Sequence, residues 1–364
     1  MGGPTRELAG VDLSDLPRMV RWYSPAFLVA LGIRGLITNL IRWAAREHIS
    51  DATRDGAAPE VMLGIVKLYD YSRAAGSSEA PLWLDYVANF GEGFDSTYAV
   101  ASLIAQEKLD IPGIDPLPSS EIVILGNNKV GPAGTWNDYK LRFELPYAMA
   151  LPHKPQSQPR RLFALPADSD WFDGLNEFDR TFCRARYSQS GEHGFAGWEC
   201  PQHRNYFAIR LPHDWWIWGA DIHLSRPLDL GQVLYFRKIA ETIKASGAPA
   251  NIVLCVAGGE WRKQDASALP GRDSFSFFVE TAQSADAGIR LVLSGEPHHY
   301  SRFASTDSER SYVIAGGGGA YLSSTHDVPR KQPAAAPDGE DIALQRRSGS
   351  GDQGSSTAAC WPSR

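Results

Sequence analysis

Short apolar runs, each ending in a loop of small or polar residues, recur through the middle of this chain. Runs of this length that are rich in β-branched and aromatic residues are typical of buried strands. They are Trp83–Ala88, Glu121–Leu125, Leu162–Pro166, Trp215–Ala220, Ile252–Val256 and Ile289–Leu293. The pattern predicts one main domain over residues 81–328, built on a strand core.

Helical patterns fall between the apolar runs. The stretch Ser96–Leu109 opens on Ser96, a residue type favoured at helix N-caps, and Asp229–Ser246 opens on Asp229. The second stretch places several apolar residues along one side: Leu234, Phe236, Ile239 and Ile243. Strands that alternate with helices predict an α/β layered fold. In such folds the loops after the strands are the usual place for a binding or catalytic site.

The two ends of the chain differ from its middle. Within residues 1–80, the apolar segment Tyr23–Trp43 is interrupted by Pro25 and Arg34. It therefore predicts a buried or amphipathic helix rather than a membrane-spanning one, with an interfacial role left open. Residues 329–364 are rich in Pro, Gly, Ser and Ala, and this composition predicts a disordered linker or tail.

Composition excludes several classes of protein. A net charge of -6 argues against non-specific nucleic-acid binding, which needs basic patches. The four cysteines form no CxxC pair, so neither a zinc knuckle nor a redox dithiol is indicated. Their scatter fits a reducing compartment, and residues 1–15 lack the pattern of a signal peptide. We therefore expect a cytoplasmic protein, with membrane association as the alternative.

The loops after the apolar runs carry oxygen and imidazole groups that suit hard or borderline cations. These residues are Asn89, Glu92, Asp95, Asn127, Asn128, Asp168, Ser169, Asp170, Asp173, Glu296, His298 and His299. Each one alone is weak evidence, because Asn and Asp also occupy turns for backbone reasons.

The order and amino-acid sequences of these loops resemble those of the calcineurin-like metallophosphoesterases, particularly a bacterial branch that is often membrane-associated. The resemblance covers residues 15–328. Its most specific stretches are LDYVANFGEGFDSTYAVA, FALPADSDWFDGL, QHRNYFAIRLPHDWWIWGADIHL, LVLSGEPHHYSRF and IAGGGGAYLSSTHDVP. It implies a metallo-dependent phosphatase-like fold, in which two mixed β-sheets lie face to face and are flanked by helices. It also implies two divalent metals of the Mn, Fe or Zn type and a small phosphoester substrate.

The chain departs from the family at most of the positions that carry this chemistry. By the resemblance, Asn89 and Asn128 stand where Asp ligands belong, and Ser169 stands where a His would act as the acid. The positions implied for metal are Asn89, Glu92, Asn128, Asp168, Glu296 and His298, and those implied for catalysis are Ser169 and His299. Loss of anionic ligands weakens a site that must hold two dications.

Three functions follow as hypotheses. The first is a degenerate phosphoesterase, or pseudoenzyme, with weak or no two-metal hydrolysis. The second is an active metal-dependent phosphoester hydrolase that uses Glu92, Asp168, Glu296 and His298. The third is a membrane-associated scaffold that contacts a membrane surface through its N-terminal segment.

Other motifs point to no separate activity. Pro132-Ala133 follows the glycines at 126 and 131 where a phosphate-binding loop would have Lys and Ser or Thr. No GxSxG motif of a serine hydrolase is present. Trp215, Trp216 and Trp218 are predicted to be core and surface of one strand, and the glycines 316–319 to form a tight turn beside the site.

Overall fold

The computed structural model describes most of the chain between residues 67 and 323 and shorter stretches outside it. The described residues are 16–22, 24–25, 28–29, 32, 67–72, 81–128, 130–132, 134–151, 160–172, 174–187, 193–195, 197–222, 228–258, 274–305, 309–323, 331–335 and 341–346.

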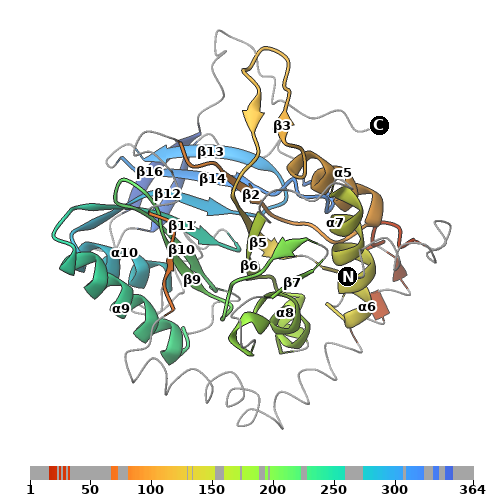
Figure 1. The fold of residues 1–364 in the computed structure, drawn as a ribbon, viewed down its shortest axis with the longest axis horizontal. Coiled ribbons are helices and arrows are strands. Elements are labelled where there is room, and N and C mark those ends of the chain that lie inside the picture. The colour runs from red at the N-terminus through yellow and green to blue at the C-terminus, as the bar shows by residue number, and fades with distance from the viewer. Residues whose placement is uncertain are drawn as a thin grey trace.

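The larger sheet has nine strands and mixes parallel and antiparallel pairs (Figure 1). Its order is β1 (Tyr69–Asp70), β9 (Phe207–Arg210), β10 (Trp215–Ala220), β11 (Ala250–Val256), β12 (Ala287–Ser294), β14 (Ser311–Ala315), β13 (Tyr300–Ser305), β16 (Asp341–Arg346) and β15 (Lys331–Ala335). The run from β10 through β11 and β12 to β14 is parallel. Their carboxyl ends therefore lie at one edge.

The smaller sheet has five strands. Its order is β2 (Leu84–Val87), β5 (Ile122–Asn128), β6 (Arg160–Pro166), β8 (Trp198–Glu199) and β7 (Gly194–Phe195). The strands from β2 to β8 pair in parallel, and β7 is antiparallel to β8. A separate hairpin of β3 (Lys108–Leu109) and β4 (Leu117–Pro118) projects from the body in Figure 1.

The two sheets share an apolar layer. Ile122 and Phe163 of the smaller sheet join Phe207, Ile217 and Cys255 of the larger one in a single buried cluster. The second face of each sheet is covered by helices, so the order of layers is helix, sheet, sheet, helix. This architecture bears out the predicted α/β class with mixed sheets flanked by helices.

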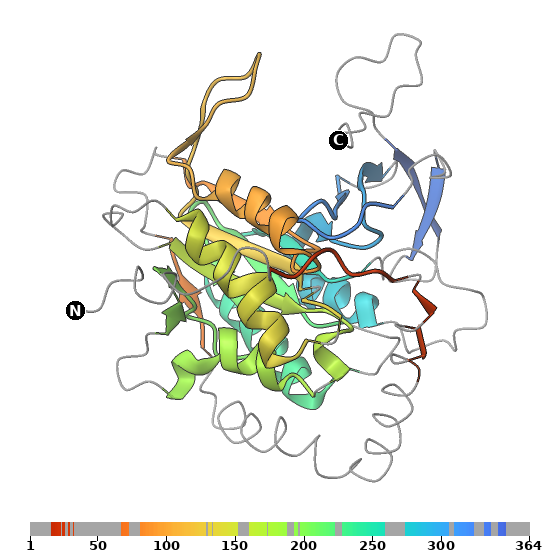
Figure 2. The same ribbon diagram turned by 90° about the vertical axis from the view of Figure 1, so that its right-hand side faces the viewer.

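The helices divide between the two outer faces (Figures 1 and 2). α9 (Leu230–Ala245) and α10 (Ser274–Ser284) pack on the larger sheet through residues such as Phe236 and Phe278. The helices that cover the smaller sheet are α5 (Phe94–Ile104), α6 (Trp136–Tyr139), the π-helical turn η2 (Lys140–Glu144), α7 (Leu145–Ala150) and α8 (Asn176–Phe182). Short 3-10 turns complete the fold at η3 (Asp170–Phe172) and η4 (Arg184–Tyr187).

Every predicted apolar run corresponds to a strand. The helix predicted at Asp229 is confirmed: the Asp229 side chain accepts a hydrogen bond from the Gln232 amide, as an N-cap does. The cap predicted at Ser96 is wrong, because α5 begins at Phe94 with Gly93 as its N-cap, and the helix ends at Ile104. Ser96 Oγ instead donates to the backbone oxygen of Gly319, a tertiary contact that no local pattern encodes.

Strands lie in both segments that flank the predicted main domain, residues 81–328. Tyr69–Asp70 forms β1 beside β9, so the folded sheet reaches into the predicted N-terminal helical segment, residues 1–80. A strand of two residues is too short to leave a periodic pattern. The rest of that segment lies largely outside the described residues, and so does most of Tyr23–Trp43.

The predicted disordered tail, residues 329–364, contains the hairpin of β15 and β16. β16 pairs with β13, which extends the larger sheet. Composition measures how much apolar area a segment can bury, but a strand added to a sheet edge is held by backbone hydrogen bonds. Pro333 lies in the outermost strand, where a missing N–H is tolerated. The remaining residues of this segment lie outside the described part of the chain.

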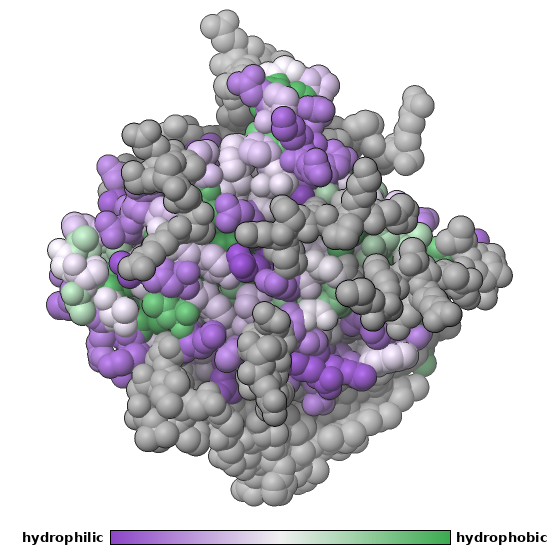
Figure 3. Space-filling view, viewed as in Figure 1, coloured by the Kyte–Doolittle hydropathy of each residue, from purple (hydrophilic) through white to green (hydrophobic). Residues whose placement is uncertain are grey.

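The surface in Figure 3 is mainly hydrophilic where residues are described, with apolar side chains in small separate groups. Scattered exposed apolar residues are normal for a folded protein. Within the described residues, no helix combines the length and the apolar character that crossing a bilayer requires.

Candidate functional site

The candidate site lies where the carboxyl ends of parallel strands from both sheets approach each other. Asn89 follows β2, Asn127 lies near the end of β5, and Gly295 and Gly316 follow β12 and β14. Residues far apart in the sequence therefore become neighbours, as expected for loops at the carboxyl edges of α/β sheets.

The centre of the site is a pair of hydrogen-bonded amide side chains. Asn89 Nδ2 donates to the backbone oxygen of Gly295 at 2.7 Å, and Asn127 Nδ2 donates to Asn89 Oδ1 at 2.6 Å. Both side chains are fully buried. Backbone bonds reinforce them, since the Asn89 amide donates to the Asn127 oxygen and the Ala320 amide donates to the Asn89 oxygen. Uncharged groups thus join the end of β5 to the loops after β2, β12 and β14.

The Gly295 carbonyl determines how the amide groups of Asn89 and Asn127 are oriented. Only the NH₂ group of Asn89 can face the Gly295 oxygen, so Asn89 Oδ1 must face Asn127. Asn127 therefore turns its NH₂ group toward Asn89 and its Oδ1 atom the other way. Among the described residues, Asn127 Oδ1 has no hydrogen-bond donor although it is buried.

The backbone around Asn89 is shaped for this arrangement. Asn89 has φ 60°, the left-handed region that Asn tolerates better than most residues. Gly316 is needed opposite it: a Cβ there would lie 2.3 Å from the Gly295 oxygen and 2.7 Å from Asn89 Nδ2. The predicted turn of glycines at 316–319 does lie beside the site, and it packs directly on Asn89.

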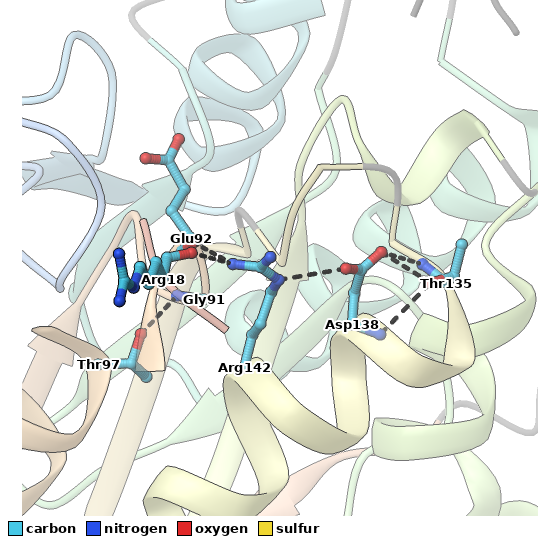
Figure 4. A network of polar contacts seen from close by, with 7 residues as sticks. All are labelled: Arg18, Gly91, Glu92, Thr97, Thr135, Asp138 and Arg142. Atoms are coloured by element: carbon cyan, nitrogen blue, oxygen red, sulfur yellow. Dashed lines mark hydrogen bonds and ion pairs between the residues drawn. The ribbon is translucent and has the colours of Figure 1, made fainter. Parts of the chain in front are cut away.

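Glu92 is buried, and both of its carboxylate oxygens accept hydrogen bonds from the protein. Trp22 Nε1 donates to Oε1 at 2.8 Å, and the Tyr321 amide donates to Oε2 at 3.0 Å. The backbone oxygen of Glu92 also accepts from Arg142 Nη1 (Figure 4). In that view the Glu92 carboxylate points away from Arg142. Glu92 is thus used as an anchor for other segments.

Arg142 joins three parts of the chain near Glu92. Besides Glu92, its guanidinium donates to the Arg18 oxygen at 2.9 Å and contacts Asp138 Oδ1 at 3.2 Å. Burial lowers the pKa of Arg142, while the carboxylates of Asp138 and Glu92 act in the opposite direction. Asp138 is itself held by a capping box with Thr135 at the start of α6.

His298 is buried beside Glu296, whose side chain is partly exposed. His298 Nδ1 lies 3.1 Å from the Tyr321 backbone oxygen, and because a carbonyl can only accept, Nδ1 is the donor. Its Nε2 atom lies 3.8 Å from Glu296 Oε1, and the Glu296 side chain is 31% exposed. The Tyr321 ring lies against the imidazole, with ring centroids 4.2 Å apart and the ring planes tilted by 33°. Tyr321 therefore connects Glu92 to His298.

The other predicted residues lie around this centre. His299 is buried and its Nε2 atom lies 3.1 Å from Ser301 Oγ, toward β13. Asn128 ends β5 and pairs with Pro166 across to β6. Asp168 and Ser169 follow β6 in the next loop, where Ser169 is buried and Asp168 is half-buried.

The neighbouring Asp170 has a structural role. Its carboxylate accepts from the Tyr139 hydroxyl at 2.7 Å and from the Ala167 amide at 2.8 Å, which fixes the loop after β6 against α6. Asp95 lies in the first turn of α5, where its charge suits the helix dipole. Asp173, another of the predicted residues, lies outside the described part of the chain.

The described residues do not fit a two-metal centre. None of them form a group of three or more His, Cys, Asp or Glu side chains close enough to hold a metal ion. Asn89 presents an NH₂ group to a carbonyl, and both Glu92 oxygens already accept hydrogen bonds. Two dications held close together require several anionic ligands.

Sequence reasoning missed three residues that organise the site. Trp22 lies in the N-terminal segment, Arg142 in the π-helical turn η2, and Tyr321 in the loop after β14. None of them belongs to a chemical motif. A buried Trp N–H or Arg guanidinium needs partners, but the sequence does not say which ones.

Comparisons with known proteins give little further guidance. No protein-family model matches this chain, and neither does any curated protein. One solved structure that it resembles is described as "GAP50 the anchor in the inner membrane complex of Plasmodium". That match has a TM-score of 0.43 and 10% sequence identity, and it covers 73% of this chain and 84% of the other. A likeness at this level supports no inference about family or activity.

Proposed function

We propose that this protein is a degenerate relative of the calcineurin-like metallophosphoesterases that keeps their layered fold and uses the loop cluster for binding or regulation without two-metal hydrolysis. The observation that carries the proposal is the uncharged Asn89–Asn127 pair at the centre of the cluster. An amide that donates to two neighbouring loops can hold them together without a cation.

The electrostatics support this function. In a metal centre, cations hold negatively charged ligands together. Here Asn89 Nδ2 lies 2.7 Å from the Gly295 backbone oxygen and 3.4 Å from the Gly316 backbone oxygen. The positive end of the NH₂ dipole thus faces these two oxygens. Hydrogen bonds of this kind are directional and stabilise one arrangement of the loops.

Metal content and turnover test the proposal directly. We expect the purified full chain to hold substoichiometric Mn, Zn, Fe or Mg and to hydrolyse a generic phosphoester no faster than a His298→Ala control. Metal-dependent turnover that His298→Ala abolishes would contradict it.

Restoring the family's residues tests the underlying resemblance. The triple substitution Asn89→Asp, Asn128→Asp and Ser169→His should raise the affinity for Mn²⁺ or Zn²⁺, measured by calorimetry, at least about ten-fold, because each added carboxylate favours cation binding. Asn137→Asp is the matched control, since Asn137 is exposed on α6 and its new charge lies outside the cluster. If the triple variant stays folded and gains no more affinity than Asn137→Asp, the resemblance is wrong.

An active hydrolase with substituted ligands is the second candidate. It is favoured by the buried His298, whose Nε2 atom lies 3.8 Å from Oε1 of the partly exposed Glu296. Glu296→Gln distinguishes the two hypotheses. It should not change the phosphoester turnover of a degenerate protein, and it should abolish the turnover of an active hydrolase. Asp168→Asn provides the same test in the neighbouring loop.

A membrane-surface role is the third candidate. Leu28 and Val29 are 51% and 63% exposed, and such side chains favour an apolar partner. Flotation with anionic liposomes tests it, with Leu28→Asp and Val29→Asp together as the variant. Recovery of the wild-type chain entirely in the lipid-free fraction would exclude this role.

A further inference from the structure

The N-terminal residues 17–22 lie in an extended path across the loop after β2 and the start of α5 (Figure 2). Their contacts with this loop are mainly backbone hydrogen bonds. The Phe94 amide donates to the Pro17 oxygen at 3.0 Å, and the Val20 amide donates to the Glu92 oxygen at 3.2 Å. An extended segment recognised in this way resembles a peptide docked on a protein surface.

Side chains on the receiving surface fix the segment at two further points. Arg142 donates to the Arg18 oxygen, and the same guanidinium donates to the Glu92 oxygen (Figure 4). At the other end, the Trp22 indole donates to the Glu92 carboxylate at 2.8 Å. The carboxylate accepts one indole N–H, so it selects Trp over Phe at this position.

The receiving surface is also shaped for close backbone approach. A Cβ at Gly93 would lie 3.2 Å from both the Cα and the N atom of Met19. The absence of a side chain at position 93 therefore lets the segment lie flat on the loop. Met19 itself remains 39% exposed, so the segment lies at the surface.

We propose that the surface formed by Glu92–Phe94, Arg142 and Tyr321 is a docking site for an extended peptide carrying a tryptophan, and that the chain's own residues 17–22 occupy it. Occupation covers the Glu92 side of the loop cluster. A partner peptide with similar backbone and a Trp can compete for the same place. The inference goes beyond the proposed function, because it depends only on the contacts of this segment.

Hydrogen exchange on the full chain tests whether the segment is docked and separable. The double variant Val20→Pro and Trp22→Phe removes two donors to Glu92 while keeping the aromatic ring. We expect the Phe94 amide to exchange at least about ten-fold faster in this variant, because its acceptor, the Pro17 oxygen, is released. The amides of β10, β11 and β12 should exchange as in the wild type. Trp215→Phe is the matched control, since Trp215 is 37% exposed and lies on the far sheet.

A labelled peptide with the sequence of residues 16–24 then tests docking in trans. We expect it to bind the double variant at least about ten-fold more tightly than the wild type, whose site is already occupied at high effective concentration. The same peptide with Ala in place of Trp should bind the variant at least about ten-fold more weakly.

Three outcomes would overturn the proposal. Unchanged Phe94 exchange would mean that the segment is not docked in solution. Equal loss of protection in β10–β12 would mean that the segment is part of the cooperative fold. If the peptide of residues 16–24 and its Ala-substituted form bind with the same affinity, and the double variant binds them no more tightly than the wild type, the surface does not recognise an extended segment through its Trp.

Discussion

Phe236, in the apolar layer beneath α9 and α10, and Asn89, in the loop cluster, are equally buried but are held in place by different forces. Phe236 is fully buried and packs its ring against the rings of its neighbours Tyr206, Trp218, Tyr235 and Phe278. Asn89 is also fully buried, but it is held by specific donors and acceptors.

The difference shows what each region tolerates. Apolar packing is non-directional, so its loss scales with the area and volume removed. A buried amide pair is directional, so a change of a single atom leaves a donor or acceptor without a partner. We therefore expect volume to decide the outcome of substitutions in the first region, and charge and hydrogen-bonding capacity to decide it in the second.

The largest effect is expected for Phe236→Ala. Removing this ring should lower the free energy of unfolding by about 3–5 kcal/mol, through lost burial and the cavity left behind. Urea unfolding measures the change, with Tyr300→Ala as the control because Tyr300 is 70% exposed. If Phe236→Ala lowers the free energy of unfolding no more than Tyr300→Ala does, this layer is not a packed core.

The isosteric change Asn89→Asp tests the second region. It replaces the NH₂ group that faces Gly295 with an oxygen, and we expect a loss of about 2–4 kcal/mol at neutral pH. Burial should raise the pKa of the new carboxyl above its unfolded value of about 3.9. The deficit should therefore be smallest below about pH 3.9 and grow as the pH rises toward the folded pKa. Unfolding measured across that range would show no such trend if the amide were not buried against carbonyls.

A smaller loss is expected for Asn127→Ala. This change leaves Asn89 Oδ1 without its donor and should cost about 1–3 kcal/mol. A double-mutant cycle with Asn89→Ala should give a coupling energy of about 0.5–3 kcal/mol, because the two side chains interact directly. Additive effects of the two substitutions would contradict the proposed pair.

The smallest effect concerns the pH dependence at Asp85, at the edge of the smaller sheet. Burial raises the pKa of Asp85, opposed by the hydrogen bond from Ser120 and the charge of Arg160. Because the folded pKa lies above the unfolded one, the contribution of this carboxyl to stability falls as pH rises from about 3.9 through the folded pKa. Asp85→Asn should make the unfolding free energy less dependent on pH in that window. Ser119→Ala serves as a neutral control. If the unfolding free energy of Asp85→Asn depends on pH as steeply as that of the wild type, Asp85 is not the source of this pH dependence.

The two regions also differ in how far the sequence predicted them. The strands Trp215–Ala220 and Ala250–Val256 and the helix after Asp229 follow from apolar runs and a cap residue. The tryptophans of β10 divide as expected, with Trp215 partly exposed and Trp216 and Trp218 buried. Residue type was sufficient for the strands because β10 is buried almost without interruption and β11 along most of its length, so each contains a short apolar run.

The loop cluster was predicted only as a set of candidate positions. Asn89, Glu92, Glu296 and His298 were identified as metal positions from the resemblance, but their partners were not. Glu92 contacts Trp22, which is 70 positions away, and Asn89 contacts Gly295, which is 206 positions away. No local pattern reports contacts over such separations.

The sequence by itself determined the α/β alternation, the strands of the core and the loops that would meet at their ends, because these depend on periodicity and residue type. Only the tertiary structure decided that the Asn89 amide faces a carbonyl, that Glu92 anchors the N-terminal segment, and that β15 and β16 extend the sheet. Each of these depends on which donor meets which acceptor across the fold, and that choice is made by the packing of distant segments.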